Sequence, residues 1–152
     1  MKLLILSDSH GAFAPMEEAV RREQPDQIIH LGDLWRDAKA LGAVFPHLPV
    51  EMVPGNCDAM FSAPQEKLLK IEGHVLLIGH GHTWRVKQSL LAAAYAAEEQ
   101  GAEVLLFGHT HQPYCGKRGT ALLFNPGSIR NGDYGVLSLT EDGVDAALFH
   151  LN

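Results

Sequence analysis

Short apolar runs alternate with longer amphipathic stretches over the first two thirds of the chain. The apolar runs predict buried strands at residues 3–6, 27–31, 50–53, 75–78 and 104–107. The amphipathic stretches predict helices at residues 15–23, 35–44 and 88–100. Pro15 suits the first turn of a helix, and Gly101 is typical of the position just beyond a helix end. This alternation predicts βαβ units.

The pattern changes after Gly108, where strand-like runs follow one another without helices between them. These runs cover residues 114–117, 120–124, 134–139 and 145–151. Glycine-containing turns at residues 116–119 and 141–143 are typical of β-hairpins. We therefore expect an α/β fold with two stacked mixed β-sheets, helices outside them and an antiparallel C-terminal portion.

Length and composition indicate one globular domain over residues 1–152. A 152-residue chain is close to the common domain size of about 100 to 150 residues. Hydrophobic residues make up 46% and charged residues 20%, near the averages for soluble globular proteins. No apolar stretch reaches the roughly 18 to 20 residues that span a bilayer. The N-terminal apolar run has no cleavage site after it, so we expect the first strand of a cytoplasmic protein with no membrane partner.

Net charge and cysteine content indicate which partners and which cellular compartment to expect. The formal net charge of −6 argues against long nucleic acids as partners, because binding them normally requires a basic surface. Bound cations would offset part of this negative charge. The two cysteines, Cys57 and Cys115, form no disulfide framework, which favours a reducing compartment.

Five polar motifs, most of them directly following a predicted strand, carry the candidate chemistry. They are Asp8-Ser9-His10, Gly32-Asp33, Gly55-Asn56-Cys57-Asp58, Gly79-His80-Gly81-His82 and Gly108-His109-Thr110-His111. Taken singly, the first could be a turn with a helix cap and the second a simple loop. Together they hold five of the nine histidines, and open α/β sheets place their sites at the carboxyl ends of strands. The set predicts a two-metal hydrolase.

The ligand types indicate which metals and which reaction to expect. Two metals about 3.5 to 4 Å apart can activate water and spread the charge of a phosphoryl group, usually with a carboxylate shared between them. Mixed Asp, Asn and His ligands suit Mn most of all, with Fe, Zn, Ni or Co as alternatives, rather than a structural zinc. The chain contains no Cys-x-x-Cys pair.

These motifs resemble those of the calcineurin-like metallophosphoesterase superfamily, whose order is D-x-H, G-D, G-N-H-D/E, H and G-H-x-H. The small size, the cysteine in the third motif and residues 125–128 are most similar to its small bacterial and archaeal phosphodiesterase branch. The resemblance implies a four-layer α/β/β/α fold and a phosphodiesterase whose nucleophile is a hydroxide bridging two metals. It also implies a ligand set: Asp8, His10 and His111 for one metal, Asn56, His80 and His109 for the other, and Asp33 between them.

Two residues near these ligands have open roles. Position 57 is usually histidine in the wider family, where it assists the leaving oxygen, whereas Cys57 is a weak hydrogen-bond donor. Because Cys57 is an unusual general acid, we expect substrates with good leaving groups to be hydrolysed readily and others slowly. Cys57 either takes part in catalysis or is a small packed residue. His82 is expected beside the ligands or in contact with substrate, or else in a structural role.

Other candidates have weaker signals. His30 is expected to be a hydrogen-bonded core histidine, Asp58 to orient the loop of Asn56, and residues 125–128 to shape the site. Arg36 and Arg130 either bind phosphate or are solvated. Trp35 either packs or lines the cleft.

Rival functions remain at this stage. A phosphomonoesterase would use the same metals, and a protein-binding scaffold would use the fold alone, as one trafficking member of this superfamily does. Exposed apolar surface at Trp84 or along residues 90–97 could pair subunits as a homo-oligomer, although burial in the core accounts for both segments equally well.

Overall fold

Two five-stranded β-sheets form the centre of the computed structural model, which describes residues 1–58 and 62–152. In spatial order, sheet A contains β10 (Gly143–His150), β9 (Asp133–Thr140), β1 (Lys2–Leu6), β2 (Gln27–His30) and β3 (Val50–Met52). Sheet B contains β4 (Glu66–Ile71), β5 (His74–Gly79), β6 (Val104–Leu106), β8 (Ala121–Asn125) and β7 (Tyr114–Arg118). Each sheet has three parallel strands extended by antiparallel ones.

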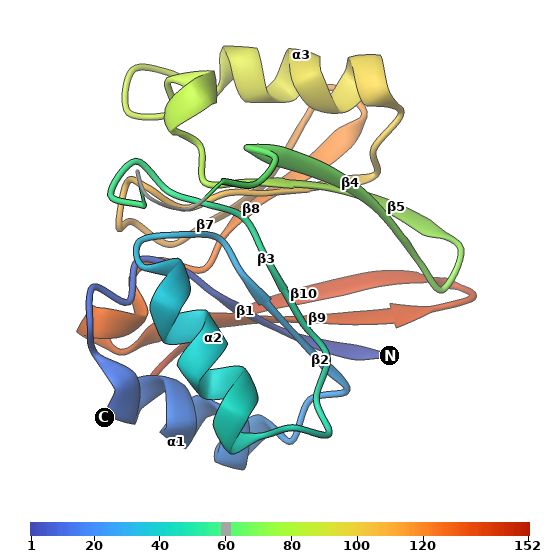
Figure 1. The fold of residues 1–152 in the computed structure, drawn as a ribbon. Coiled ribbons are helices and arrows are strands. Elements are labelled where there is room, and N and C mark those ends of the chain that lie inside the picture. The colour runs from blue at the N-terminus through green and yellow to red at the C-terminus, as the bar shows by residue number, and fades with distance from the viewer. Residues whose placement is uncertain (59–61) are drawn as a thin grey trace.

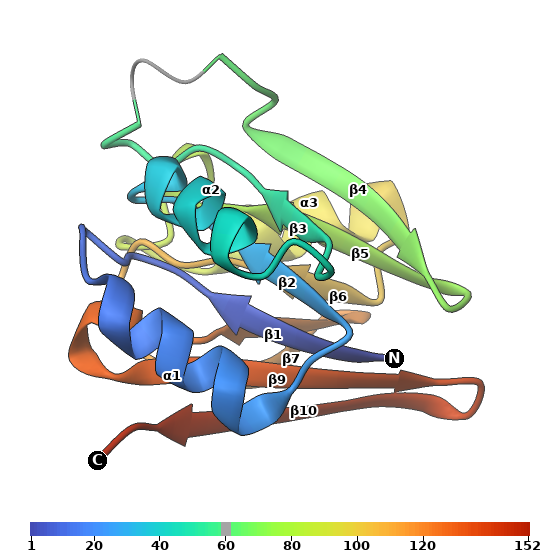
Figure 2. The same cartoon turned by 60° about the horizontal axis from the view of Figure 1, so that its bottom comes forward.

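Helices cover the outer faces of the two sheets (Figures 1 and 2). The α-helices α1 (Phe13–Glu23) and α2 (Trp35–Val44) pack on sheet A, and α3 (Leu91–Gln100) packs on sheet B. The short 3-10 helices are η1 (His82–Trp84) and η2 (Ile129–Asn131). The predicted α/β class with two stacked mixed sheets is confirmed. Trp84 is only 5% exposed and belongs to the core under α3, so it offers no pairing surface.

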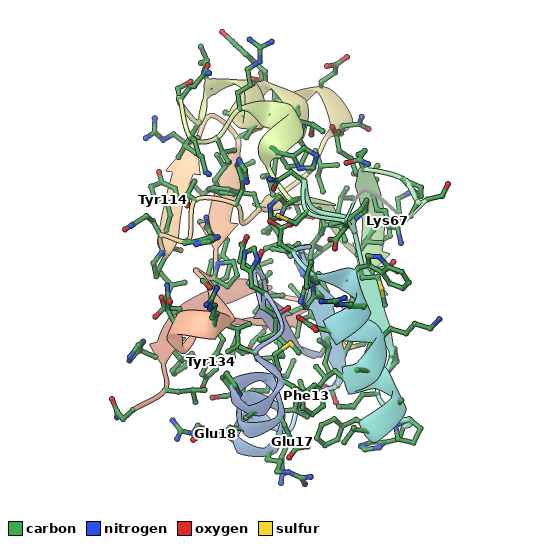
Figure 3. The ribbon with its side chains drawn as sticks, turned by 60° about the vertical axis from the view of Figure 1, so that its left-hand side comes forward. Phe13, Glu17, Glu18, Lys67, Tyr114 and Tyr134 are labelled. Atoms are coloured by element: carbon green, nitrogen blue, oxygen red, sulfur yellow. The ribbon has the colours of Figure 1, made fainter. Side chains whose placement is uncertain are left out.

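Alternation along the strands builds the layers. In β1, Leu3 and Ile5 face the core between the sheets, whereas Leu4 and Leu6 face the core beneath α1 and α2. All four side chains are fully buried, and burying each one stabilises the fold by about 1.5–3 kcal/mol. On α1, Met16 is buried while Glu17 and Glu18 lie on the outer side (Figure 3).

Strand β4 was not predicted, although it forms an edge of sheet B. Its sequence, EKLLKI, mixes charges with apolar residues because only one face of an edge strand is covered. A two-residue turn, Glu72-Gly73, joins it to β5, and both residues have positive φ, as a tight hairpin turn requires. This turn was the signal that the strand prediction overlooked.

Several predicted boundaries were wrong by a few residues. Helix α3 begins at Leu91 rather than residue 88, because the preceding residues form turns and the Ser89 hydroxyl accepts the Leu91 amide hydrogen. The hairpin turn between β7 and β8 falls at residues 119–120 rather than 116–119. Helix α2 occupies the predicted residues.

Candidate metal centre

Strand order brings the five polar motifs to one end of the sandwich. Strands β1, β2 and β3 of sheet A, and β5 and β6 of sheet B, each end shortly before one motif or within its first residue. The loops that follow these strands lie together at the end of the molecule opposite the N-terminus (Figure 1). Three groups of ligand atoms meet there, each with its atoms within 4.8 Å of one another: Asp8, His10 and His111; Asp8, Asp33 and His80; and His10, Asp33 and Cys57.

Asp8 uses its two carboxylate oxygens differently. Its Oδ2 accepts hydrogen bonds from the Ser7 hydroxyl at 2.6 Å and from the His109 backbone N–H at 3.0 Å. Its Oδ1 faces three imidazole Nε2 atoms, at 3.2 Å from His111 and at 3.7 Å from both His10 and His80. The side chain is fully buried, so one oxygen is held by the protein while the other points into the cluster.

The two carboxylate oxygens of Asp33 also have different partners. Its Oδ1 accepts the Cys57 backbone N–H at 2.9 Å, and its Oδ2 lies 3.3 Å from His80 Nε2 and 3.9 Å from His10 Nε2. Burial by itself would raise the pKa of Asp33, but the nearby His80 and Cys57 outweigh it and the pKa falls well below its usual range. Both Asp8 and Asp33 therefore contribute oxygens to more than one ligand group.

His80 presents a definite tautomer to these carboxylates. Its Nδ1 lies 2.8 Å from the Leu31 carbonyl oxygen, which can only accept, so Nδ1 carries the hydrogen. The lone pair is then on Nε2, which faces Asp8 and Asp33, the arrangement typical of metal-binding histidines. Burial lowers the pKa of His80, but the two carboxylates outweigh this effect and leave it raised.

Unpartnered buried atoms converge on this cluster. Among the described residues, the buried side-chain nitrogen and oxygen atoms without a hydrogen-bond partner are Asp8 Oδ1, His10 Nε2, His80 Nε2 and His82 Nδ1. Leaving such atoms unsatisfied costs about 1–3 kcal/mol each. Because three of them are anionic or lone-pair donors that face one another, the residues fit divalent cations.

Backbone strain is concentrated in the same loops. Of the eight non-glycine residues with positive φ in the described chain, five lie in the motifs: Asp8, His10, Asp33, His109 and His111. Such conformations are costly and cluster at active sites. Gly108 allows the two sheets to approach here, because a Cβ at this position would lie 2.0 Å from Ser7 Oγ.

A buried polar network supports the sheet A loops. The Gly32 N–H donates to His30 Nδ1 at 3.1 Å, so His30 Nε2–H donates to Ser9 Oγ at 3.0 Å. The Ser9 hydroxyl donates to Asp37 Oδ2 at 2.7 Å, and that oxygen also accepts the Gly11 N–H. His30 is a core histidine, as predicted, and burial lowers its pKa to about 4. The roles of Ser9 and Asp37 were not predicted.

Asp58 holds the loop of the third motif, as predicted. Its Oδ2 accepts N–H groups of Asp33 and Gly55 at 2.9 and 2.8 Å. Asn56 and Cys57 are exposed in this loop, with Asn56 Nδ2 3.9 Å from Cys57 Sγ. Burial and the nearby Asp33 raise the pKa of Cys57, so the free thiol is protonated at neutral pH.

Histidines from sheet B line the other side of the cluster. The ring of His109 lies 5.0 Å from that of His80 and 6.1 Å from that of His82. Burial, followed by the influence of His80, lowers the pKa of His82, and the same causes lower that of His109 to about 4. Both rings are therefore neutral at pH 7 and retain a lone pair.

Residues 125–128 hold two loops of the site by hydrogen bonds. The buried Asn125 side chain donates to the Gly108 carbonyl and to Thr110 Oγ1, and the Ser128 hydroxyl donates to the Asp8 carbonyl at 2.8 Å. Arg36 and Arg130 are exposed, and Trp35 is half-buried with Lys39 over its ring.

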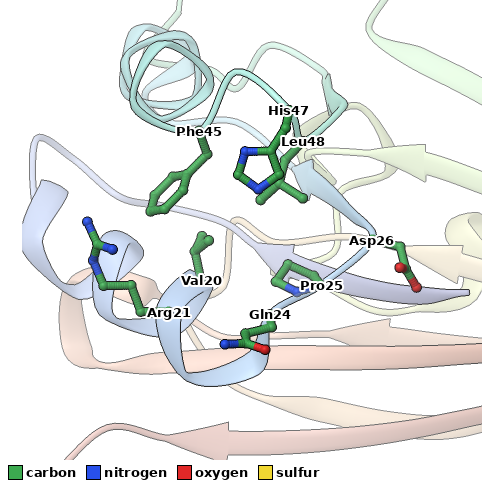
Figure 4. A pocket seen from close by; sticks show the side chains of 8 residues that line it. All are labelled: Val20, Arg21, Gln24, Pro25, Asp26, Phe45, His47 and Leu48. Atoms are coloured by element: carbon green, nitrogen blue, oxygen red, sulfur yellow. The ribbon is translucent and has the colours of Figure 1, made fainter.

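A cavity of about 640 Å³ lies elsewhere, at the C-terminal ends of α1 and α2 (Figure 4). Arg21, Phe45 and His47 are among its lining residues, and no motif residue contributes to it. The metal centre is thus an open cluster of ligands rather than this cavity.

Comparison with known proteins agrees with the geometry. The family model described as a calcineurin-like phosphoesterase superfamily domain matches residues 1–142. The chain belongs to this superfamily. It is 35% identical to a probable metallophosphoesterase, YsnB, of Bacillus subtilis over 98% of this chain and 90% of that one. It is 27% identical to the phosphodiesterase YfcE of Escherichia coli K12, covering 85% and 79% of the two chains.

A solved structure shows the same fold. A Streptococcus pneumoniae protein described as a predicted phosphoesterase superposes with a TM-score of 0.82 at 24% identity, over 98% of this chain and 88% of that one. Family membership supports a metal-binding phosphoesterase. In the part of the chain that the structure describes, every helix is too short or too polar to cross a membrane.

Proposed function

We propose that this chain is a metal-dependent phosphodiesterase. The observation that carries the proposal is the convergence of buried, unpartnered ligand atoms where the two sheets meet. Asp8, His10 and His111 would hold one ion, Asn56, His80 and His109 a second, with Asp33 shared. Mn²⁺ suits this oxygen and nitrogen set. Two divalent ions, when bound, would activate water as the nucleophile and offset the charge of the phosphoryl oxygens.

The chain's own groups hold the reacting parts in place. The Cys57 amide fixes one Asp33 oxygen and leaves the other directed toward His80 and His10. His82 is neutral at pH 7 and has a buried, unpartnered Nδ1 beside the cluster, so it is suited to contact a phosphoryl or leaving-group oxygen. The name of YfcE supports a diester as the substrate class.

The test is hydrolysis of a bis-aryl phosphodiester and its matching monoester by chelator-stripped protein given Mn²⁺. Diesterase activity that returns with metal and well exceeds monoesterase activity is the expected result. A monoester preference would instead assign the site to a phosphomonoesterase. Metal binding without either activity would favour a scaffold.

Leaving-group dependence tests the role of position 57. Because a thiol is a weak general acid, diesters with acidic leaving groups should react much faster than alkyl diesters. A series of aryl and alkyl diesters would measure the slope. Equal rates across the series would contradict the idea that Cys57 limits leaving-group protonation.

A further inference from the structure

Cys57 forms a group of possible metal ligands with His10 and Asp33. The superfamily ligand set includes His10 and Asp33 but not position 57. The Cys57 Sγ, one ring nitrogen of His10 and one Asp33 oxygen lie within 4.8 Å of one another. Ligand atoms around one tetrahedral zinc are about 3.3–3.8 Å apart, given bond lengths of about 2.0–2.3 Å. Because Cys57 is exposed in the loop after β3, a small movement of its side chain would complete the set.

The other members of this cluster are prepared for a cation independently of Cys57. His10 Nε2 is buried without a hydrogen-bond partner among the described residues, and it lies 3.7 Å from Asp8 Oδ1, which is equally unpartnered. Asp33 is 3% exposed and keeps one oxygen directed at His10 and His80. The thiol therefore lies on the solvent-exposed side of ligand atoms that already face one another.

We propose that Cys57 is a metal-selective ligand, whose sulfur binds the ion held by His10 and Asp33 when that ion is thiophilic, as Zn²⁺, Cd²⁺ and Co²⁺ are. This inference rests on the proposed metal centre. Coordination forms a metal–sulfur bond and releases the thiol proton to solvent, with no change of oxidation state. Mn²⁺ prefers oxygen and nitrogen ligands, so with Mn²⁺ the thiol stays protonated and unbound.

The consequence is that the identity of the metal sets the activity. A catalytic metal needs a coordination position open to water or substrate. Sulfur would occupy such a position in the zinc form and leave it open in the manganese form. The zinc form should therefore be the slower diesterase, and Cys57→Ser should raise its activity.

Cobalt absorption tests the sulfur bond directly. Chelator-stripped full-length wild type, Cys57→Ser and Cys115→Ser are titrated with Co²⁺. Cys115→Ser is the matched control, since Cys115 is the only other cysteine and is also exposed, on β7. We expect a sulfur-to-cobalt charge-transfer band in the near ultraviolet for wild type and Cys115→Ser and none for Cys57→Ser. We also expect Cys57→Ser to weaken Zn²⁺ binding at least about 10-fold and to leave Mn²⁺ affinity unchanged.

The outcomes separate this inference from the proposed function. Visible cobalt bands without the ultraviolet band in wild type would overturn the role of Cys57 and leave the metal centre standing. A band that persists in Cys57→Ser would overturn it as well. If wild type gives no cobalt bands at all, both the inference and the proposed metal centre fail.

Discussion

The two sheets supply different chemistry to the metal centre. Loops of sheet A contribute the carboxylates Asp8 and Asp33, together with Asn56 and one histidine, His10. Loops of sheet B contribute imidazoles only: His80, His82, His109 and His111. Negative charge thus comes from one half of the sandwich and most of the imidazole nitrogens from the other, so the complete set exists only when the sheets are stacked.

The two halves are also held differently. The sheet A loops are joined by buried side-chain hydrogen bonds through Ser9, His30, Asp37 and Asp58. The sheet B loops are held by Asn125 of sheet B, which donates to Gly108 and Thr110. They also make contacts across the seam, such as the His109 amide on Asp8 and His80 on the Leu31 carbonyl. The loops of sheet A are therefore tied mainly to one another, whereas those of sheet B also depend on sheet A.

Asp33→Asn should have the largest effect, since it removes the charge shared between ligand groups. We expect diesterase activity to fall by more than about 100-fold, beyond the 10–100-fold typical of losing an outer partner of a ligand. Asp26→Asn is the matched control, because Asp26 is an exposed carboxylate that accepts only the Lys2 amide hydrogen among the contacts described. A fully active Asp33→Asn enzyme would refute the shared role.

Metal should stabilise the protein by linking the two sheets. At a free Mn²⁺ concentration about 100 times Kd, binding adds about 2.7 kcal/mol, or roughly 5–10 °C in Tm for a chain of this size. Thermal unfolding with Mn²⁺ and with chelator measures the difference. His80→Ala should lose most of the Mn²⁺-dependent increase in Tm, whereas the control His47→Ala, at an exposed histidine, should keep it. An equal increase in both variants would contradict the idea that metal links the two sheets through His80.

Ser9→Ala tests the preorganisation of the sheet A loops. It leaves the His30 Nε2–H and the Leu34 N–H without their shared acceptor. We expect Mn²⁺ affinity, measured by chelator competition, to weaken about 10–100-fold. Ser89→Ala, at the start of α3, is the control. Unchanged affinity in Ser9→Ala would show that packing alone positions Asp8 and His10.

The smallest effect is expected at the opposite end of the sandwich, where His74 also joins the sheets. Its ring bonds the Thr140 carbonyl of sheet A and Glu103 of sheet B, and these contacts raise its pKa. A raised folded-state pKa adds stability below the ordinary value of 6.5, and this is lost as pH rises through the folded value. Between about pH 6 and 8, the Tm of the metal-free wild type should fall more than the Tm of metal-free His74→Gln. If Tm falls equally with pH in both proteins, His74 does not stabilise the contact between the sheets in this way.

Local pattern was sufficient for the apolar runs and for the partly exposed strands β7 and β10, but it was insufficient for edge strand β4. Runs such as β1 and β6 are nearly all apolar, so they were predictable. Edge strand β4 was not, because its exposed face carries charges that hide the alternation. Ser9 was in a predicted motif, but its link to Asp37 joins residues 28 positions apart and has no local signal.

By itself, the sequence determined the ligand types, their order and their places after apolar runs, since apolar runs form strands and the helices between them make neighbouring strands parallel. Only the tertiary structure decided which carboxylate oxygen stays free, which tautomer His80 adopts and that Cys57 joins His10 and Asp33. Those properties depend on contacts between residues that are distant in the chain, and no local pattern specifies them.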